Sequence, residues 1–293
     1  IPVSDGDLQL SASLAVGEIP PEVASIEQVL ATVNMALKRS KVSGKDRVSA
    51  FRSNGDRAVD AASDEVALDA EAIELGAVIQ TIRSLDDERI VGVEALTRGP
   101  SGFYAAPSDL FRAAAEQNTL TTLDLRALRG CLALLREVHP DLPYHVNVFP
   151  STVLNTPVNE MISLFGIEPG RLCLEISEQS FLGDPSYLRE PLAELRDLGV
   201  RLAIDDVGYG RSSIESLLVL EPEVVKIDRR CIDAITTHAG ERRRLERLLN
   251  MLSTVASDVI VEGVETEEEL TVLRDLGVNV GQGYYWDPPN EES

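Results

Sequence analysis

The stretch RLCLEISEQSFLGDPSYLREPLAELRDLGVRLAIDD, residues 171–206, contains two apolar strands separated by one helix. We expect the helix over Tyr187–Leu198, with its four leucines facing the core. The first strand carries Glu175 near its end, and the second ends in Asp205 and Asp206. An ionised group at the end of a buried strand is costly unless it is paired. The stretch therefore predicts a parallel βα repeat with a charged site at the strand ends.

The same pattern recurs on both sides of this stretch. Polar or charged residues lie near the ends of further predicted strands in VGVEAL (91–96), YHVNVF (144–149), EVVKID (223–228), VIVEGVE (259–265) and VNVGQGYY (278–285). With the strand that holds Gln80, eight strands alternate with helices, which fits a (β/α)8 TIM-like barrel better than an open sheet. Such barrels carry their active sites at the C-terminal ends of the strands, where these residues lie.

The beginning of the chain is organised differently. Residues 1–51 predict a strand–helix–strand unit, an α/β fragment too small to bury an independent core. Residues 52–75 are polar and acidic, which indicates a linker that runs into a helix. The barrel domain is therefore expected over residues 76–293.

The charge of the chain limits its partners. It has 49 acidic and 27 basic residues, a net charge of −22, and such a surface repels phosphate backbones and anionic membranes. We therefore expect neither polymeric nucleic acid nor a membrane as a partner. No signal peptide and no apolar run of about 18 residues is found, which predicts a cytoplasmic protein. Because the sequence opens without Met, we expect a piece of a longer protein that carries a sensor or a membrane anchor.

Hard oxygen ligands dominate the predicted strand ends. They are Glu94, Asn147, Glu175, Asp205, Asp206 and Glu262. Oxygen ligation favours Mg²⁺ or Mn²⁺, whereas zinc would favour His and Cys. The adjacent Asp205 and Asp206 would repel each other without a cation, and a carboxylate shared by two metals is used for in-line displacement at phosphorus. Lys226 lies between two apolar residues and suits a group that orients or deprotonates a water.

Taken together, these motifs resemble the EAL family of cyclic di-GMP phosphodiesterases. They are Gln80, EALTR (94–98), VN (146–147), EISE (175–178), DDVGYGRSS (205–213), KID (226–228), EGVE (262–265) and GQGYY (281–285). Their order and spacing carry the resemblance, because a lone Glu-Ala-Leu occurs by chance in many helical proteins. The resemblance implies a barrel whose first strand runs antiparallel to the others. It also implies hydrolysis of one phosphodiester of cyclic di-GMP to linear pGpG by a water that two metal ions activate.

The resemblance also implies roles for individual residues. Glu94, Asn147, Glu175 and Asp205 would hold one Mg²⁺ or Mn²⁺ ion, and Asp205, Asp206 and Glu262 would hold a second. Lys226 would act on the attacking water, so the catalytic residues are Lys226, Glu262 and Asp206. The substrate-binding positions are Gln80, Leu96, Arg98, Glu265 and Gln282, and Glu178 would support the loop after Asp206. A homodimer through this domain is implied as well.

Three departures from the family pattern accompany these matches. Val207, Tyr209 and Arg211 stand where the family has an aromatic, a small and a second aromatic residue; Phe149 replaces the usual Ser, and Thr81 the usual Pro. In the family, the loop after the Asp pair couples the dimer interface to the metal site, so its changes bear on turnover and regulation. A catalytically silent receptor for cyclic di-GMP therefore stays open as the alternative, as does a phosphodiesterase for another nucleotide.

The N-terminal piece resembles the final third of a GGDEF-like (diguanylate cyclase) domain. SASLAV (11–16) corresponds to its late strand, and ALKRSKVSGKDRVSAF (36–51) to its closing helix and strand. The nucleotide-binding motif of that family would lie upstream, so the resemblance implies no cyclase activity here. Other polar and aromatic residues have simpler structural explanations: we expect His145 to be a satisfied core histidine and Trp286 to cover the barrel rim.

Overall fold

The computed structural model describes residues 2–3, 6–7, 14–17, 48–51, 68–101, 104–138, 141–181, 184–208 and 214–287. The chain divides into two compact units, Ile1–Val66 and Ala67–Ser293. In the first unit, β1 (Pro2–Val3) pairs antiparallel with β2 (Gly6–Asp7), and β3 (Leu14–Gly17) pairs parallel with β4 (Val48–Phe51). The helix expected between these strands lies outside the described residues. The GGDEF-like assignment and the domain limits therefore stay predictions.

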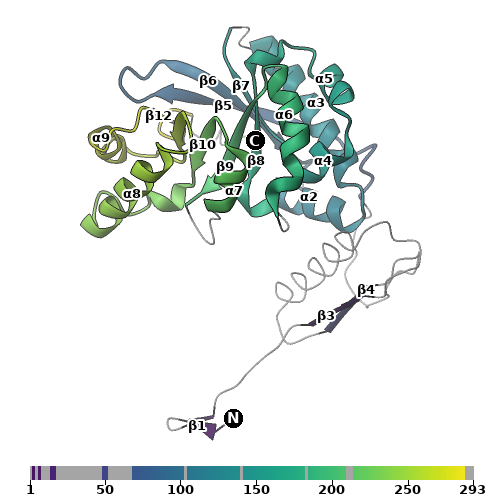
Figure 1. The fold of residues 1–293 in the computed structure, drawn as a ribbon, viewed down its shortest axis with the longest axis horizontal. Coiled ribbons are helices and arrows are strands. Elements are labelled where there is room, and N and C mark those ends of the chain that lie inside the picture. The colour runs from purple at the N-terminus through teal and green to yellow at the C-terminus, as the bar shows by residue number, and fades with distance from the viewer. Residues whose placement is uncertain are drawn as a thin grey trace. The chain divides into compact units, whose positions relative to one another are not determined.

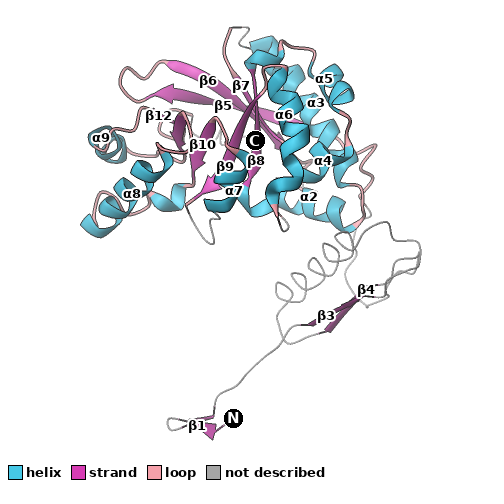
Figure 2. Ribbon diagram, in the orientation of Figure 1, coloured by secondary structure: helices cyan, strands magenta, loops and turns pink. Residues whose placement is uncertain are grey.

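The second unit is a closed barrel of eight strands surrounded by helices, which confirms the expected architecture (Figures 1 and 2). The strands are β5 (Gly76–Ser84), β6 (Ile90–Arg98), β7 (Tyr144–Asn147), β8 (Leu172–Ser177), β9 (Arg201–Val207), β10 (Val224–Ile227), β11 (Asp258–Val261) and β12 (Val280–Gly281). The first strand, β5, runs antiparallel to both of its neighbours, and the other neighbouring pairs are parallel. Only a short turn joins β5 to β6, and a parallel pairing would need a much longer crossover.

Helices connect the remaining strands around the outside of the barrel. They are α2 (Pro107–Glu116), α3 (Leu120–Val138), α4 (Pro150–Asn155), α5 (Val158–Phe165), α6 (Arg189–Asp197), α7 (Ile214–Leu220), α8 (Ala239–Leu252) and α9 (Glu267–Asp275). Short 3₁₀ turns are η1 (Pro169–Arg171), η2 (Glu178–Ser180), η3 (Pro185–Leu188) and η4 (Arg229–Cys231). Among the described residues, no helix combines the length and apolar character that a membrane span requires.

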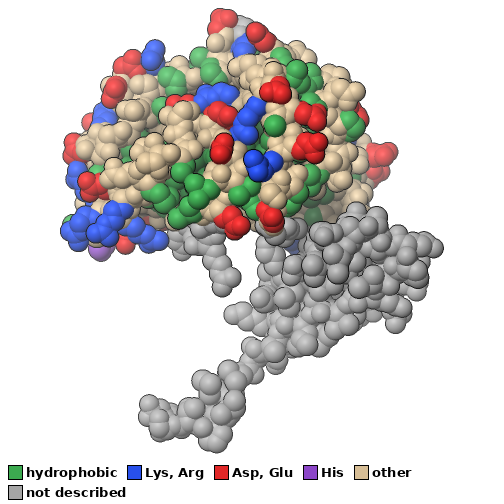
Figure 3. Space-filling view, in the orientation of Figure 1, with side chains coloured by type: hydrophobic (Ala, Val, Ile, Leu, Met, Phe, Trp, Pro, Cys, Tyr) green, Lys and Arg blue, Asp and Glu red, His purple; other side chains and the backbone are tan. Residues whose placement is uncertain are grey.

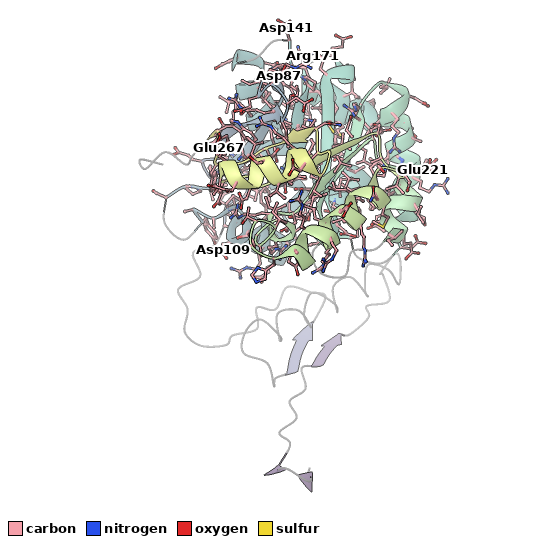
Figure 4. The ribbon with its side chains drawn as sticks, turned by 90° about the vertical axis from the view of Figure 1, so that its left-hand side faces the viewer. Asp87, Asp109, Asp141, Arg171, Glu221 and Glu267 are labelled. Atoms are coloured by element: carbon pink, nitrogen blue, oxygen red, sulfur yellow. The ribbon has the colours of Figure 1, made fainter. Side chains whose placement is uncertain are left out.

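One of these helices tests a sequence prediction directly. The helix expected over Tyr187–Leu198 is divided between η3 and α6, and three of its leucines are buried. Leu198 is 50% exposed at the C-cap of α6, so the prediction that it faces the core was wrong. The helix α9 begins with a capping box between Thr266 and Glu269. Glu267, in the first turn of α9, lies on the outside of the barrel (Figure 4).

The barrel interior is built in layers, because side chains two residues apart on a strand face the same side. Five strands contribute to an apolar floor of Ile82, Cys173, Ala203, Val224 and Ile260. On each parallel strand, the residue two positions after the floor residue is polar. These residues are Glu175, Asp205, Lys226 and Glu262. On β5 the order is reversed, since Gln80 precedes Ile82 on a strand that runs the opposite way. A polar layer therefore lies directly above an apolar floor.

The last described residues fold back along the outer face of β5. Asp287 accepts a hydrogen bond from the backbone N–H of Thr81 at 2.6 Å, and the indole of Trp286 donates to Glu88 at 3.0 Å. The usual Pro in place of Thr81 would have no N–H to donate. Trp286 thus covers the outside of the barrel. Elsewhere, acidic side chains are scattered over the surface among apolar ones (Figure 3).

Candidate active site

A buried lysine lies at the centre of the polar layer. Lys226 of β10 is fully buried, and its Nζ lies 2.9 Å from Glu94 Oε2, 2.8 Å from Glu175 Oε2 and 2.8 Å from Glu262 Oε1. Asp205 Oδ1 is 3.9 Å away. The ammonium group donates hydrogen bonds to Glu94 and Glu175, and it forms a further ion pair with Glu262. In this arrangement Lys226 is the counter-ion of an acidic cluster.

The lysine and the burial of the cluster act on its acids in opposite directions. Burial raises the pKa of Glu262 and Glu175 well above the usual range, and it also raises the pKa of Asp205. Burial would raise the pKa of Glu94 as well, but Lys226 and hydrogen bonds lower it to about 2. The nearby carboxylates raise the pKa of Lys226 although burial opposes this. One positive charge is therefore shared among more acids than it can neutralise, and the site favours additional cations.

The adjacent aspartates lie where β9 meets the following loop. Asp206 has a backbone φ of +62°, a left-handed conformation that non-glycine residues seldom adopt. Its N–H donates to Asp205 Oδ1 at 2.8 Å, and Ser177 Oγ donates to Asp206 Oδ2 at 2.8 Å. Asp205, Asp206 and Glu262 each present a carboxylate oxygen within 4.8 Å of the others. These three carboxylates lie close enough together to hold a divalent cation that prefers oxygen ligands.

Two amide side chains complete the acidic cluster. Gln282 donates from Nε2 to Glu94 Oε2 at 2.8 Å and to Glu262 Oε1 at 3.2 Å, and it also approaches Gln80 at 3.4 Å. Its Oε1 is buried and has no hydrogen-bond partner within the described residues. Asn147, exposed at the end of β7, donates to Glu94 Oε1 at 2.9 Å. A buried oxygen without a donor is available to a cation or a water.

A family model described as the EAL domain matches residues 64–289. The chain belongs to the EAL domain family. A probable cyclic di-GMP phosphodiesterase of Escherichia coli, PdeB, is 30% identical over 217 residues, covering 71% of this chain and 41% of PdeB. An uncharacterised signalling protein of Caulobacter vibrioides is 29% identical over 293 residues, 97% of this chain and 36% of that protein. The chain thus spans less than half the length of both relatives.

A solved structure supports the same assignment. BlrP1 of Klebsiella pneumoniae, in complex with calcium and cyclic di-GMP, has 25% identity and a TM-score of 0.65. The match covers 72% of this chain and 54% of the BlrP1 chain. The EAL domain described here therefore has both cyclic di-GMP phosphodiesterase relatives and a structural neighbour that binds the dinucleotide.

The remaining predicted residues are those expected to contact the substrate. Leu96 and Arg98 follow Glu94 on the same face of β6, nearer the end of that strand. The Arg98 guanidinium donates to the carbonyl of Thr97 at 3.1 Å. Glu265 forms an ion pair with Arg229, 3.0 Å apart. Their roles as substrate contacts stay predictions.

Several supporting contacts in the EAL domain were not predicted from the sequence. Ser177, one residue before Glu178, bonds Asp206 directly, whereas the role predicted for Glu178 stays a prediction. Phe149 packs its ring 5.1 Å from that of Phe111, and its N–H donates to Asp124 at 2.9 Å. Only spatial proximity between distant segments reveals these pairs. A serine at the end of a strand is too common to mark such a site by itself.

Proposed function

We propose that this EAL domain hydrolyses one phosphodiester bond of cyclic di-GMP, giving linear pGpG, and that it requires two Mg²⁺ or Mn²⁺ ions. The observation that carries the proposal is the convergence of carboxylates from β6, β8, β9 and the residue that follows β11 around a single buried lysine. The identity of the substrate is inferred from similar proteins: PdeB is a probable cyclic di-GMP phosphodiesterase, and BlrP1 was solved with the dinucleotide.

The residues present offer oxygen ligands for two divalent cations, which supports the proposal. Asp205, Asp206 and Glu262 would hold one ion, since their oxygens lie within 4.8 Å of one another. Glu94, Asn147, Glu175 and Asp205 would hold the other. The unpartnered Oε1 of Gln282 further shows that the site has spare acceptor capacity. Bound divalent ions supply Lewis-acid activation of a water and neutralise charge on the phosphate oxygens.

Lys226 would hold the attacking water close to the scissile phosphate. Its ammonium group is held by hydrogen bonds to Glu94 and Glu175 and by an ion pair with Glu262. With these carboxylates neutralised by bound cations, the attraction that holds the ammonium against each of them would weaken. An N–H would then be free to bond the water and orient it, with Arg98 offering its planar fork to a phosphate oxygen. Gln80, Leu96, Glu265 and Gln282 would line the rest of the substrate site.

We also propose that the EAL domain forms a homodimer. On α7, Ile214 is 50% exposed and Leu218 is 59% exposed, and one helical turn separates them on the same face. Large apolar side chains grouped on a surface commonly mark protein interfaces. The helix begins after the altered loop that follows Asp206, so association at α7 would bear on the geometry of the aspartates.

Nucleotide chromatography tests the activity. The purified protein is incubated with cyclic di-GMP and Mg²⁺ or Mn²⁺, and in parallel with chelator. Metal-dependent appearance of pGpG is the expected result. Asp206→Asn should abolish turnover while binding of cyclic di-GMP persists, and Asn tolerates the left-handed φ of +62° at this position. Glu267→Gln is the matched control, because it removes an exposed carboxylate from α9.

The possible results separate the two candidate functions. Intact substrate despite measurable binding would refute hydrolysis and favour the silent receptor. Absence of binding would refute the assignment to cyclic di-GMP. If Asp206→Asn kept full turnover, the proposed ligand set would be wrong even for an active enzyme.

A further inference from the structure

His145 is a buried group that the proposed mechanism does not use. Its side chain is 5% exposed, and its Nδ1 lies 2.7 Å from Oε1 of the fully buried Glu175. The other oxygen of Glu175, Oε2, accepts from Lys226 at 2.8 Å. Each carboxylate oxygen of Glu175 is thus held by a different side chain.

The position of His145 in the barrel explains the contact. It lies two residues before Asn147 on β7, directly opposite Cys173 of the apolar floor and Glu94 of the polar layer. Neighbouring strands of a barrel are staggered, so a floor position on one strand lies level with a site position on another. An imidazole here can reach up to Glu175, which an apolar floor residue could not bond.

Ligation by Glu175 sets the direction of the hydrogen bond. A carboxylate that binds a metal is ionised and only accepts hydrogen bonds. Facing it at 2.7 Å, the Nδ1 of His145 must carry the hydrogen. The donor fixes the torsion of the Glu175 side chain and leaves its remaining lone pairs free. Without that donor, Oε1 of the fully buried Glu175 would lose its hydrogen-bond partner.

We propose that His145 is a positioning residue that donates from Nδ1 to Glu175 and holds this carboxylate in the orientation that binds a divalent cation. The inference rests on the proposed function, because it takes Glu175 to be a metal ligand. Groups that orient metal ligands by hydrogen bonds typically contribute about 10–100-fold to metal affinity. Loss of the His145 donor should therefore weaken Mn²⁺ binding by about that factor.

Two substitutions of nearly equal shape test the donor. His145→Asn places an amide N–H close to where Nδ1 lies, whereas His145→Leu has the same branching and no donor. Mn²⁺ affinity is measured by calorimetry in the absence of nucleotide, and unfolding in chelator is followed in parallel. We expect His145→Leu to lose about 10–100-fold in Mn²⁺ affinity and His145→Asn to recover most of it. A purely packing role would not distinguish the two variants in this way.

A spectroscopic measurement tests the proposal without any substitution. The chain contains three histidines, so ¹⁵N-histidine spectra can be assigned by replacing His238 and His139 in turn. With Mn²⁺ replaced by diamagnetic Mg²⁺, the His145 ring should show a protonated Nδ1. A ring that carries its hydrogen on Nε2 alone under these conditions would overturn the proposal, whether or not the Leu variant folds.

The outcomes also separate this inference from the proposed function. If the parent binds Mn²⁺ and hydrolyses cyclic di-GMP while His145→Leu binds the ion equally well, the inference fails and the function stands. If the parent does not bind Mn²⁺ or Mg²⁺ at all, both fail. Equal losses for Leu and Asn would also overturn the donor role.

Discussion

Replacing Lys226 by Met should destabilise the protein in chelator and make its stability depend on divalent ions. Methionine fills similar volume but leaves four acids, Glu94, Glu175, Asp205 and Glu262, without their buried cation. Removal of one partner from a buried ion pair typically costs about 3–5 kcal/mol. Mn²⁺ can replace the lost charge, so the variant should gain more stability from the ion than the parent does.

The pKa of Glu94 supports the same direction. Burial would raise it, but Lys226 and hydrogen bonds lower it from 4.5 to about 2 in the folded protein. A folded pKa below the unfolded value stabilises the protein above pH 4.5, and this contribution is lost as the pH falls towards 2. The expected cost of losing Lys226 at pH 7.5 is therefore taken from buried ion pairs, about 3 kcal/mol or more.

Thermal and chemical unfolding in chelator at pH 7.5 measure the effect. For a domain of this size about 3–5 kcal/mol corresponds to a fall in Tm of about 6–20 °C. The difference in Tm between the variant and the parent should be smaller at pH 5 than at pH 7.5. Without Lys226 the pKa of the buried acids is higher, so they are protonated at pH 5 and no longer repel one another. Arg247→Met, which removes an exposed positive charge from α8, serves as the control. A Lys226→Met protein within about 1 kcal/mol of the parent would refute the role of Lys226 as the main counter-ion.

Three further changes give expected outcomes of different kinds. Burial raises the pKa of Asp124 from 3.8 to about 6, so its charge destabilises the fold increasingly as the pH rises through that range. Asp124→Asn should add up to about 3 kcal/mol at pH 7.5 and less at pH 5 by urea unfolding, and an equal effect at both pH values would contradict this. In Gly283→Ala, the new Cβ would lie 2.1 Å from the carbonyl oxygen of Val264, so we expect a loss of about 2–3 kcal/mol. Gly240→Ala, which meets nothing within 4 Å, should unfold at or above the parent temperature, and similar behaviour of the two variants would disprove the steric argument. Leu218→Glu should shift the protein towards monomer in sedimentation velocity, whereas an unchanged dimer would place the interface elsewhere.

The barrel and its acidic cluster could be predicted because they follow from local patterns. Each strand is a mostly apolar run that carries, or is followed by, at least one residue of the site, and parallel strands bring those residues to one end. The first strand is the informative exception, since Gln80 precedes its floor residue and only the antiparallel direction brings it level with Glu94. Glu94 itself lies in the middle of β6 rather than at its end.

What the sequence did not predict depends on stagger between strands and on contacts between distant segments. His145 has the same spacing from Asn147 as a floor residue, and the register of β7 and β8 places it opposite Cys173, yet its imidazole reaches Glu175, two residues farther along β8. The bond between Thr81 and Asp287 joins residues 206 positions apart. Leu198 fits the helical period of α6, yet the helix ends one residue earlier and leaves it exposed. Periodicity identifies the face of an element, but not the partner across from it.

The reversed first strand also determines where the chain enters the barrel. In an all-parallel barrel the first strand begins at the end away from the site. Here β5 begins at Gly76, paired with Arg98 at the end of β6 nearest the proposed substrate. Gln80 is four residues farther along β5, roughly 13 Å at about 3.3 Å per residue. Tension or rotation applied to the backbone at Gly76 therefore reaches a proposed substrate contact along one continuous strand, without crossing the hydrophobic floor.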